Sequence, residues 1–167
     1  WRDHYADLRF GLQAVADVLG VEGWQTRVVA DDNALVDREA AVRAGLGWYG
    51  RNSTVLLPGY GSEVVLGSVV TDADLPVADE RVADGCGPCR RCVDACPTSA
   101  IVAPGVIDAR RCLAWLVQAA GDFPEAHRAA LGDRIYGCDD CQDVCPVNRR
   151  SAAADGVPAA EADAVDR

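Results

Sequence analysis

The sequence predicts an α+β fold in two parts, and three observations support this division. Residues 1–80 alternate between helix-like and strand-like segments and contain no cysteine. Residues 81–150 hold all eight cysteines of the chain. Residues 151–167 are rich in alanine and aspartate without an apolar period, which is typical of a disordered or truncated tail. We therefore expect one domain over 1–80, a cysteine-rich module over 81–150 and a tail without structure.

The elements follow from hydrophobic spacing and from turn residues. Apolar residues at helical spacing predict a helix over 4–19, and a strand-like run follows at 24–30. The polar residues 31–33 offer side chains that cap a helix over 34–44. We expect the remaining elements in this order: strands at 53–57 and 63–70 joined by a turn-rich loop, a polar linker over 72–85, and helices over 108–120 and 124–131.

The cysteines follow the spacing of iron–sulfur proteins. Residues 86–97 read C-x2-C-x2-C-x3-C-P, the run with which bacterial ferredoxins bind their clusters. The first three thiolates of such a run hold one cluster, and the fourth, followed by proline, ligates a second cluster. Residues 138–146 read C-x2-C-x3-C-P, and Cys112 is the one cysteine left to complete that second set.

If the last cysteine of each run crosses over, eight ligands serve two [4Fe–4S] clusters and none is spare. A disulfide framework would need an oxidising compartment, and zinc sites favour paired C-x2-C knuckles, so both alternatives fit the spacing less well. The first cluster would take Cys86, Cys89, Cys92 and Cys145, and the second would take Cys96, Cys112, Cys138 and Cys141.

The charge of the chain restricts its partners. A net charge of −10 argues against a general polyanion binder, because phosphate contacts need clustered Lys or Arg. The arginine pairs 90–91, 110–111 and 149–150 all lie beside cysteines. They are either solvated surface charge or a basic rim for an anionic substrate or cofactor. No run of 18 apolar residues occurs, so we expect no membrane-spanning helix.

Residues 31–50 contain two further candidates for a site. Residues 45–50 match G-x-G-x-x-G, but a helix precedes and a strand follows, which reverses the order of a dinucleotide-binding loop. Close backbone approach or a positive φ explains these glycines better. Asp31 is either a helix N-cap or a general acid at the mouth of a site. Asp32 and Asn33 compete for the capping role, which leaves Asp31 free.

Several motifs together resemble the epoxyqueuosine reductase family over nearly the whole chain up to Asn148. They are residues 31–53 with DREAA and AGLGWYGRN, 67–72 (GSVVTD), 96–101 (CPTSAI), 108–112 (DARRC), 135–142 (IYGCDDCQ) and 145–148 (CPVN).

The resemblance implies an oxidoreductase of queuosine biosynthesis that reduces epoxyqueuosine in the wobble position of tRNA to queuosine. It implies two [4Fe–4S] clusters and cobalamin, with electrons passing from a ferredoxin or flavodoxin through the clusters to cobalamin. The expected architecture is a partial cobalamin-binding α/β domain, similar to reductive dehalogenases, followed by a ferredoxin-like two-cluster module. We expect a cytoplasmic monomer. Carried over, Asp31 matches the proton donor, and cobalamin contacts fall at Ser53, Val55, Leu57, Cys138 and Asp139.

The chain departs from the family pattern at two places. Ala34 stands where the family has proline, and residues 117–119 (VQA) replace Thr-Ile-Glu, so no cofactor contact is carried over to that segment. The chain starts at Trp1 and contains no Met, so we expect a fragment without the upstream part of the cobalamin domain and the downstream helical repeats.

Three other functions compete with this interpretation. A ferredoxin-like electron carrier would use the clusters alone, but it would have no need of the long cysteine-free segment. Another cobalamin and iron–sulfur reductase, such as a reductive dehalogenase, would share the chemistry at cobalt. A structural metal protein is the third alternative.

Overall fold

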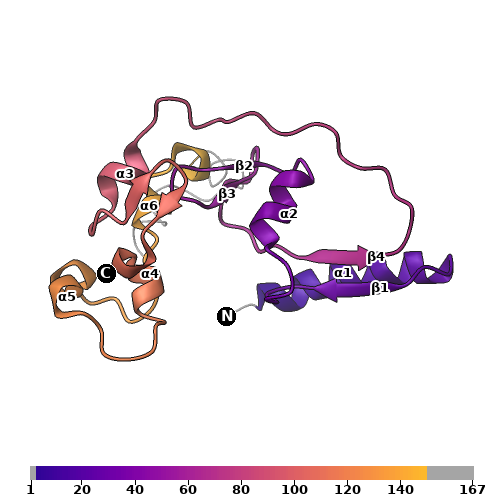
Figure 1. Ribbon diagram of the computed structural model, residues 1–167, viewed down its shortest axis with the longest axis horizontal. Helices are drawn as coiled ribbons and strands as arrows, with labels where there is room; N and C mark the ends of the chain where they lie inside the picture. The colour runs from indigo at the N-terminus through magenta and orange to yellow at the C-terminus, as the bar shows by residue number, and fades with distance from the viewer. Residues whose placement is uncertain (1–2, 150–167) are drawn as a thin grey trace. The chain divides into compact units, whose positions relative to one another are not determined.

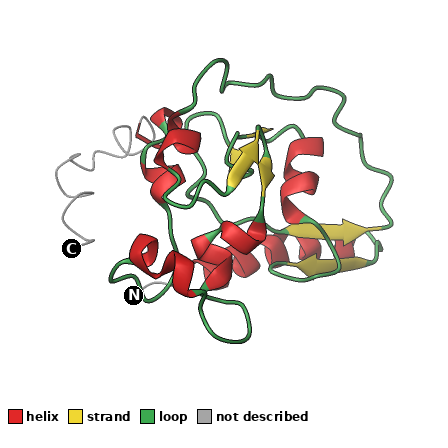
Figure 2. Ribbon diagram, turned by 60° about the vertical axis from the view of Figure 1, so that its left-hand side comes forward, coloured by secondary structure: helices red, strands yellow, loops and turns green. Residues whose placement is uncertain are grey.

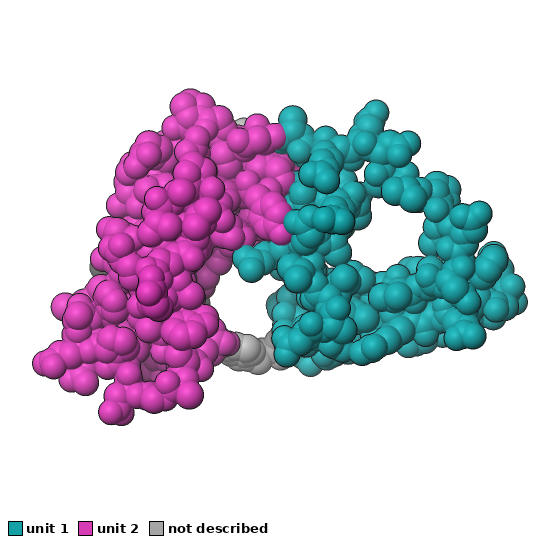
Figure 3. Space-filling view, viewed as in Figure 1, with its two compact units in different colours: residues 1–47, 63–83 teal, residues 48–62, 84–167 magenta. Residues whose placement is uncertain are grey.

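The computed structural model describes residues 3–149, which form two compact units (Figures 1 and 3). Unit 1 contains residues 3–47 and 63–83, and unit 2 contains residues 48–62 and 84–149. The division expected at residue 80 therefore lies close to the change of unit after residue 83. Residues 48–62, however, belong to unit 2 and not to the first part of the chain. The tail expected over 151–167 lies outside the described residues.

Unit 1 combines two helices with one antiparallel strand pair. Its elements are α1 (His4–Val21), β1 (Thr26–Val29), α2 (Asp37–Arg43) and β4 (Ser68–Thr71). β1 pairs with β4, with Val28 opposite Val69, and α1 packs along both strands (Figure 1).

Gly67 sets the distance between α1 and the strand pair. A Cβ at this position would lie 2.6 Å from Cδ1 of Leu12 and 3.1 Å from Cδ2 of Leu8, so a larger residue would push the helix away. Leu8 and Leu12 belong to the apolar face that the sequence predicted. The prediction of the first helix is confirmed, and the helix continues to Val21.

α2 begins at Asp37 and not at residue 34 as predicted. Its N-cap is Val36, which makes no side-chain cap hydrogen bond, so residues 31–33 do not cap this helix. Asp32 Oδ1 instead accepts a hydrogen bond from the backbone N–H of Ala34 at 2.8 Å. This bond stabilises a turn before the helix, because aspartate side chains readily bond to the backbone two residues on.

Unit 2 consists of short elements joined by loops (Figure 2). Val55, Leu56, Ile101, Leu113 and Leu116 are buried and form its apolar core. Its elements are β2 (Trp48–Tyr49), β3 (Val55–Leu56), α3 (Arg91–Ala95), β5 (Ile101–Ala103), β6 (Val106–Ile107), η1 (Ala109–Arg111), α4 (Leu113–Leu116), η2 (Glu125–His127), α5 (Arg128–Leu131) and α6 (Asp140–Asp143).

The strands pair differently from what their order suggests. β3 pairs with β2 and β4 pairs with β1, so the strands expected at 53–57 and 63–70 are not partners. All three strand pairs found in residues 3–149 are antiparallel. The polar linker over 72–85 is confirmed, since this segment has no helix or strand (Figure 1).

The helix expected over 108–120 is interrupted at a cysteine. η1 ends before Cys112, whose backbone is extended (φ −75°, ψ 117°), and α4 starts directly after it. Asp108 does cap η1, because its side chain accepts a hydrogen bond from the backbone N–H of Arg110. The helix expected over 124–131 appears as η2 followed by α5. Within residues 3–149 no helix has the length and apolar character that crossing a membrane requires.

Candidate functional site

Four thiols of unit 2 line one cavity. Cys86, Cys89 and Cys92 share it with Cys145, which lies far along the chain, and its volume is about 190 Å³. A water molecule occupies roughly 30 Å³ in the liquid, so the cavity is larger than a site for one ion or one water. These are the four cysteines that the crossing of ligands assigns to the first cluster.

Turns and two helices bring these thiols together. The backbone N–H of Cys89 donates to the carbonyl of Cys86 at 3.1 Å, which folds the first loop into a turn. Cys92 lies on α3, and α3 packs against α6. Cys145 follows α6, where its backbone N–H donates to the carbonyl of Gln142 at 2.9 Å. The packing of α3 on α6 therefore carries Cys145 to the first three thiols.

Thiols of both sets lie near Cys141 on α6. The pKa of the Cys141 thiol is raised to about 12, mainly by burial and less by the nearby thiolates of Cys138, Cys92 and Cys96, and this includes a lowering by the hydrogen bond with the Asn52 amide. Burial likewise raises the pKa of Cys138, with a smaller contribution from Cys112. Cys141 is thus close to members of both sets.

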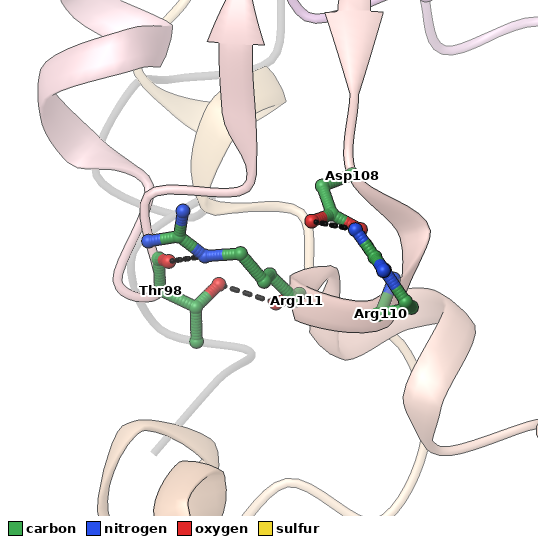
Figure 4. A network of polar contacts seen from close by, with 4 residues as sticks. All are labelled: Thr98, Asp108, Arg110 and Arg111. Carbon is green, nitrogen blue, oxygen red and sulfur yellow. Dashed lines mark hydrogen bonds and ion pairs between the residues drawn. The ribbon is translucent and has the colours of Figure 1, made fainter.

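Two hydrogen bonds between Thr98 and Arg111 join the loop after Cys96 to the segment before Cys112 (Figure 4). Arg111 Nε donates to the backbone carbonyl of Thr98 at 3.0 Å, and Thr98 Oγ1 donates to the carbonyl of Arg111 at 2.5 Å. Thr98 is buried, so these bonds are shielded from water. Thr98 lies two residues after Cys96 and Arg111 directly precedes Cys112, so this pair joins the two segments that carry these cysteines.

Cys96 differs from the other buried thiols. Burial alone would raise its pKa, but the backbone N–H of Ala100, which donates to Cys96 Sγ at 3.2 Å, and bonds from Thr98 lower the pKa below the usual value. A thiol that already accepts hydrogen bonds is prepared to carry negative charge as a metal ligand.

The first four thiols line a cavity and are not arranged around a single metal ion. Among the described residues, 3–149, no group of three or more His, Cys, Asp or Glu side chains is arranged to hold a single metal ion. A cubane cluster offers four separate iron corners to its thiolates, so its ligands are spaced more widely than those of one ion.

A buried polar network attaches residues 48–62 to the cysteine module. Asn148, which is 4% exposed, accepts at Oδ1 a hydrogen bond from the backbone N–H of Ser62 at 2.8 Å and donates to the carbonyl of Gln142 at 3.1 Å. Asn52, also 4% exposed, directs its amide to the carbonyl of Cys141 at 3.5 Å. Sequence reasoning missed both asparagines as structural residues, although both lie in motifs that it quoted.

The glycine motif has the order and the role that the sequence suggested. α2 precedes it, β2 lies within it and β3 follows it, so helix and strand have the reverse order of a dinucleotide-binding loop. Gly45 has φ +71°, and a Cβ there would lie 2.7 Å from the carbonyl oxygen of Glu80. A Cβ on Gly50 would lie 2.6 Å from Asn52 Oδ1. Positive φ and close approach therefore explain these glycines.

Asp31 lies in an acidic recess of unit 1. The recess measures about 350 Å³ and is lined by residues 31–33 and 35–38. Asp31 is exposed and has φ +54°, a conformation that aspartate adopts more readily than most residues. Asp32 is paired with Arg27 at 3.1 Å. Burial raises the pKa of Asp37, and the charges of Asp31 and Asp32 raise it further.

The five positions expected to contact cobalamin all lie in unit 2. Ser53 has φ +64°, and Val55 is buried in β3, just before Leu57. Cys138 is partly buried, and Asp139 Oδ1 accepts a hydrogen bond from Gln142 Nε2 at 2.5 Å. The hydrogen bonds from Asn52 to Cys141 and from Ser62 to Asn148 join the two segments that carry these residues.

Residues 85–148 match the family described as "4Fe-4S double cluster binding domain". Most of unit 2 is therefore a domain of the two-cluster iron–sulfur class.

Comparison with longer relatives indicates a particular family of enzymes. It is 39% identical to an epoxyqueuosine reductase of Bacillus anthracis over 89% of this chain and 39% of that protein. It is 42% identical to an epoxyqueuosine reductase of Escherichia coli over 90% of this chain and 40% of that protein. The chain is thus a homologue of part of the epoxyqueuosine reductases, and it spans about two-fifths of the length of these curated relatives.

Solved structures agree with the sequence comparison. A crystal structure of epoxyqueuosine reductase with an epoxyqueuosine-modified tRNA-Tyr stem loop matches with a TM-score of 0.83 and 40% identity, over 89% of this chain and 40% of that one. The Bacillus subtilis enzyme, with a catalytic aspartate loop swung out of its active site, matches with a TM-score of 0.81 and 39% identity, over 89% of this chain and 39% of that one.

Proposed function

We propose that the protein containing this chain reduces epoxyqueuosine to queuosine in tRNA. The observation that carries the proposal is the cavity lined by Cys145 together with Cys86, Cys89 and Cys92, in a chain homologous to epoxyqueuosine reductases. Such a cavity suits a cluster whose ligands come from two distant stretches.

The cysteines act as two ligand sets in this proposal. Cys86, Cys89, Cys92 and Cys145 hold the first [4Fe–4S] cluster, and Cys96, Cys112, Cys138 and Cys141 hold the second. The shared cavity supports the first set. Three observations support the second set. Cys138 and Cys96 raise the pKa of Cys141, Cys112 raises the pKa of Cys138, and hydrogen bonds join Thr98 to Arg111.

Cobalamin is the further cofactor that the proposal requires. Ser53, Val55, Leu57, Cys138 and Asp139 would contact it, and their common position in unit 2 fits one large ligand. Ile135 and Tyr136, which are 93% and 75% exposed just before Cys138, add apolar surface of the kind that a macrocycle covers. When bound, the clusters and cobalamin supply electrons at low potential to the epoxide.

Asp31 supplies a proton in the proposed reaction. Loss of the epoxide oxygen as water consumes two electrons and two protons and leaves a carbon–carbon double bond. A carboxylic acid at the oxygen would protonate it as the C–O bond opens. Two facts support Asp31 for this role: its side chain is exposed in the acidic recess and does not cap α2. The catalytic aspartate loop of the Bacillus subtilis enzyme also supports an aspartate in this role.

Three further properties belong to the same proposal. The electron donor is a ferredoxin- or flavodoxin-type protein, because the clusters accept one electron at a time. The enzyme acts in the cytoplasm, where its tRNA substrate is found, and as a monomer.

Anaerobic reconstitution of the full-length protein with iron, sulfide and cobalamin tests this function. The reconstituted protein, supplied with a reductant, should convert epoxyqueuosine in tRNA to queuosine. Asp31→Asn should abolish turnover and leave the cluster absorbance unchanged, whereas Asp74→Asn, an exposed change in the linker, should retain activity.

Two results would contradict the proposal. Full activity of Asp31→Asn would remove the role of that residue. A fully loaded wild-type protein that leaves epoxyqueuosine unchanged would remove the proposed reaction itself and favour an electron carrier or a reductase of another substrate.

A further inference from the structure

Arg51 brings a buried hydrogen-bond donor to the cavity of the first thiol set. Its side chain lines this cavity together with Cys86, Cys89, Cys92 and Cys145. Arg51 Nε is buried and has no hydrogen-bond partner among residues 3–149. A buried N–H without an acceptor is costly, so this donor calls for a partner that occupies the cavity.

Hydrogen bonds hold both the guanidinium and the backbone of Arg51. Arg51 Nη2 donates to the carbonyl of Gly87 at 2.7 Å, in the loop between the first two cysteines. The backbone carbonyl of Arg51 accepts a hydrogen bond from Gly105 at 2.9 Å. The turn around it is closed by Ser53, whose N–H donates to the carbonyl of Gly50 at 2.9 Å. Arg51 is therefore a fixed charge at the wall of the cavity.

A fixed cation has a defined effect on a cluster with four thiolates. Such a cluster carries net negative charge, and this charge grows when the cluster accepts one electron. A nearby positive charge therefore stabilises the reduced state more than the oxidised state. Hydrogen bonds to the cluster sulfurs act in the same direction, and both are established controls of cluster potential.

We propose that Arg51 sets the reduction potential of the cluster held by Cys86, Cys89, Cys92 and Cys145. Its Nε–H donates to a sulfur of that cluster, and its charge raises the potential, so that the cluster accepts one electron from the donor protein without uptake of a proton. This inference rests on the proposed ligand set but not on the chemistry at the epoxide.

Arg91 provides a matched comparison within the same cavity. It also lines the cavity, but its side chain is exposed, so water and salt screen its charge. Arg51 should therefore influence the potential more strongly than Arg91, although both carry the same charge.

A redox titration of the reconstituted full-length protein, followed by electron paramagnetic resonance, tests the inference without any tRNA. Arg51→Met should lower the potential of the first cluster and leave the second cluster unchanged. Arg51→Lys, which keeps the charge but loses Nε–H, should give a smaller decrease. Arg91→Met should also shift the potential less than Arg51→Met.

A second measurement uses wild-type protein, with Arg51→Lys only as the comparison. In wild-type protein with nitrogen-labelled arginine, pulsed electron paramagnetic resonance of the reduced first cluster should detect a coupled guanidinium nitrogen, and Arg51→Lys should remove it. An unchanged potential in Arg51→Met, or a wild-type cluster without coupled arginine nitrogen, would overturn the inference. A protein that binds clusters but does not reduce epoxyqueuosine would contradict only the proposed function.

Discussion

At the scale of single residues, buried polar side chains join the segments of the site. Asn148 is the clearest case, because its side chain forms hydrogen bonds with both Ser62 and Gln142 and is almost fully buried. Because Asn148 is 4% exposed, water has little access to replace a lost partner. Removal of its amide should therefore cost more than removal of an exposed one.

Asn148→Ala should lower the free energy of unfolding by about 1–3 kcal/mol, because it leaves buried donors and acceptors unpaired. Asn33→Ala, an exposed change in unit 1, is the control and should change stability by less than about 0.5 kcal/mol. Urea unfolding of the full-length protein measures both. Equal stability of the two variants would show that the network contributes nothing.

Asp37 should make stability depend on pH. Its pKa is raised in the folded state by burial and by the charges of Asp31 and Asp32, above the usual value of 3.8. The folded state therefore binds this proton more tightly than the unfolded state, and stability falls as pH rises from 3.8 through the folded pKa. Arg27, paired with Asp32, and Arg38, which also lines the recess, are the nearby cations.

Asp37→Asn should remove this loss, so the variant should be more stable than wild type near neutral pH. The difference between the two proteins should grow with rising pH and become constant above the folded pKa of Asp37. Unfolding midpoints of both proteins across a pH series measure this difference, with Asp74→Asn as the control. A pH-independent difference would contradict the perturbed carboxyl.

At the scale of elements, Gly45 is a position of unit 1 where both the backbone conformation and the space for a side chain are restricted. Gly45→Ala would place its Cβ 2.7 Å from the Glu80 carbonyl at a φ of +71°, so we expect a loss of more than about 1 kcal/mol. Gly11 lies within α1 and has open space around it. Gly11→Ala should stabilise the protein by roughly 0.5–1 kcal/mol.

Thermal unfolding of the two glycine variants tests this prediction, because Gly45→Ala should lower the melting temperature and Gly11→Ala should raise it. A stabilised Gly45→Ala variant would show that neither the positive φ nor the Glu80 contact is needed there.

Local sequence predicted some elements well and others poorly, for physical reasons. The long run of apolar residues at helical spacing in α1 and the cap that Asp108 gives to η1 depend only on neighbouring residues, so both could be predicted. The start of α2 was wrong because the Asp32 turn competes with helix formation. The pairing of β3 with β2 and the break at Cys112 depend on tertiary contacts, which hydrophobic spacing does not contain.

At the scale of the whole molecule, the cysteine spacing predicts more than the apolar pattern does. Cys145 was assigned to the first set from spacing alone, and it lines the same cavity as the other three. The attachment of residues 48–62 to unit 2 was not predictable, since it rests on hydrogen bonds such as Ser62 to Asn148 between residues far apart in sequence. The orphan donor of Arg51 likewise becomes visible only in three dimensions.

The crossing of ligands between the two cysteine runs is the central claim, and two double variants test it most directly. After anaerobic reconstitution, iron analysis and the resonance spectrum of the reduced protein report how many clusters remain. Cys86→Ala with Cys145→Ala should remove one cluster completely and leave the other intact, with about four of about eight iron atoms per chain. Cys141→Ala with Cys145→Ala should damage both clusters, so that no intact [4Fe–4S] signal remains. An intact cluster in the second variant and none in the first would contradict the account.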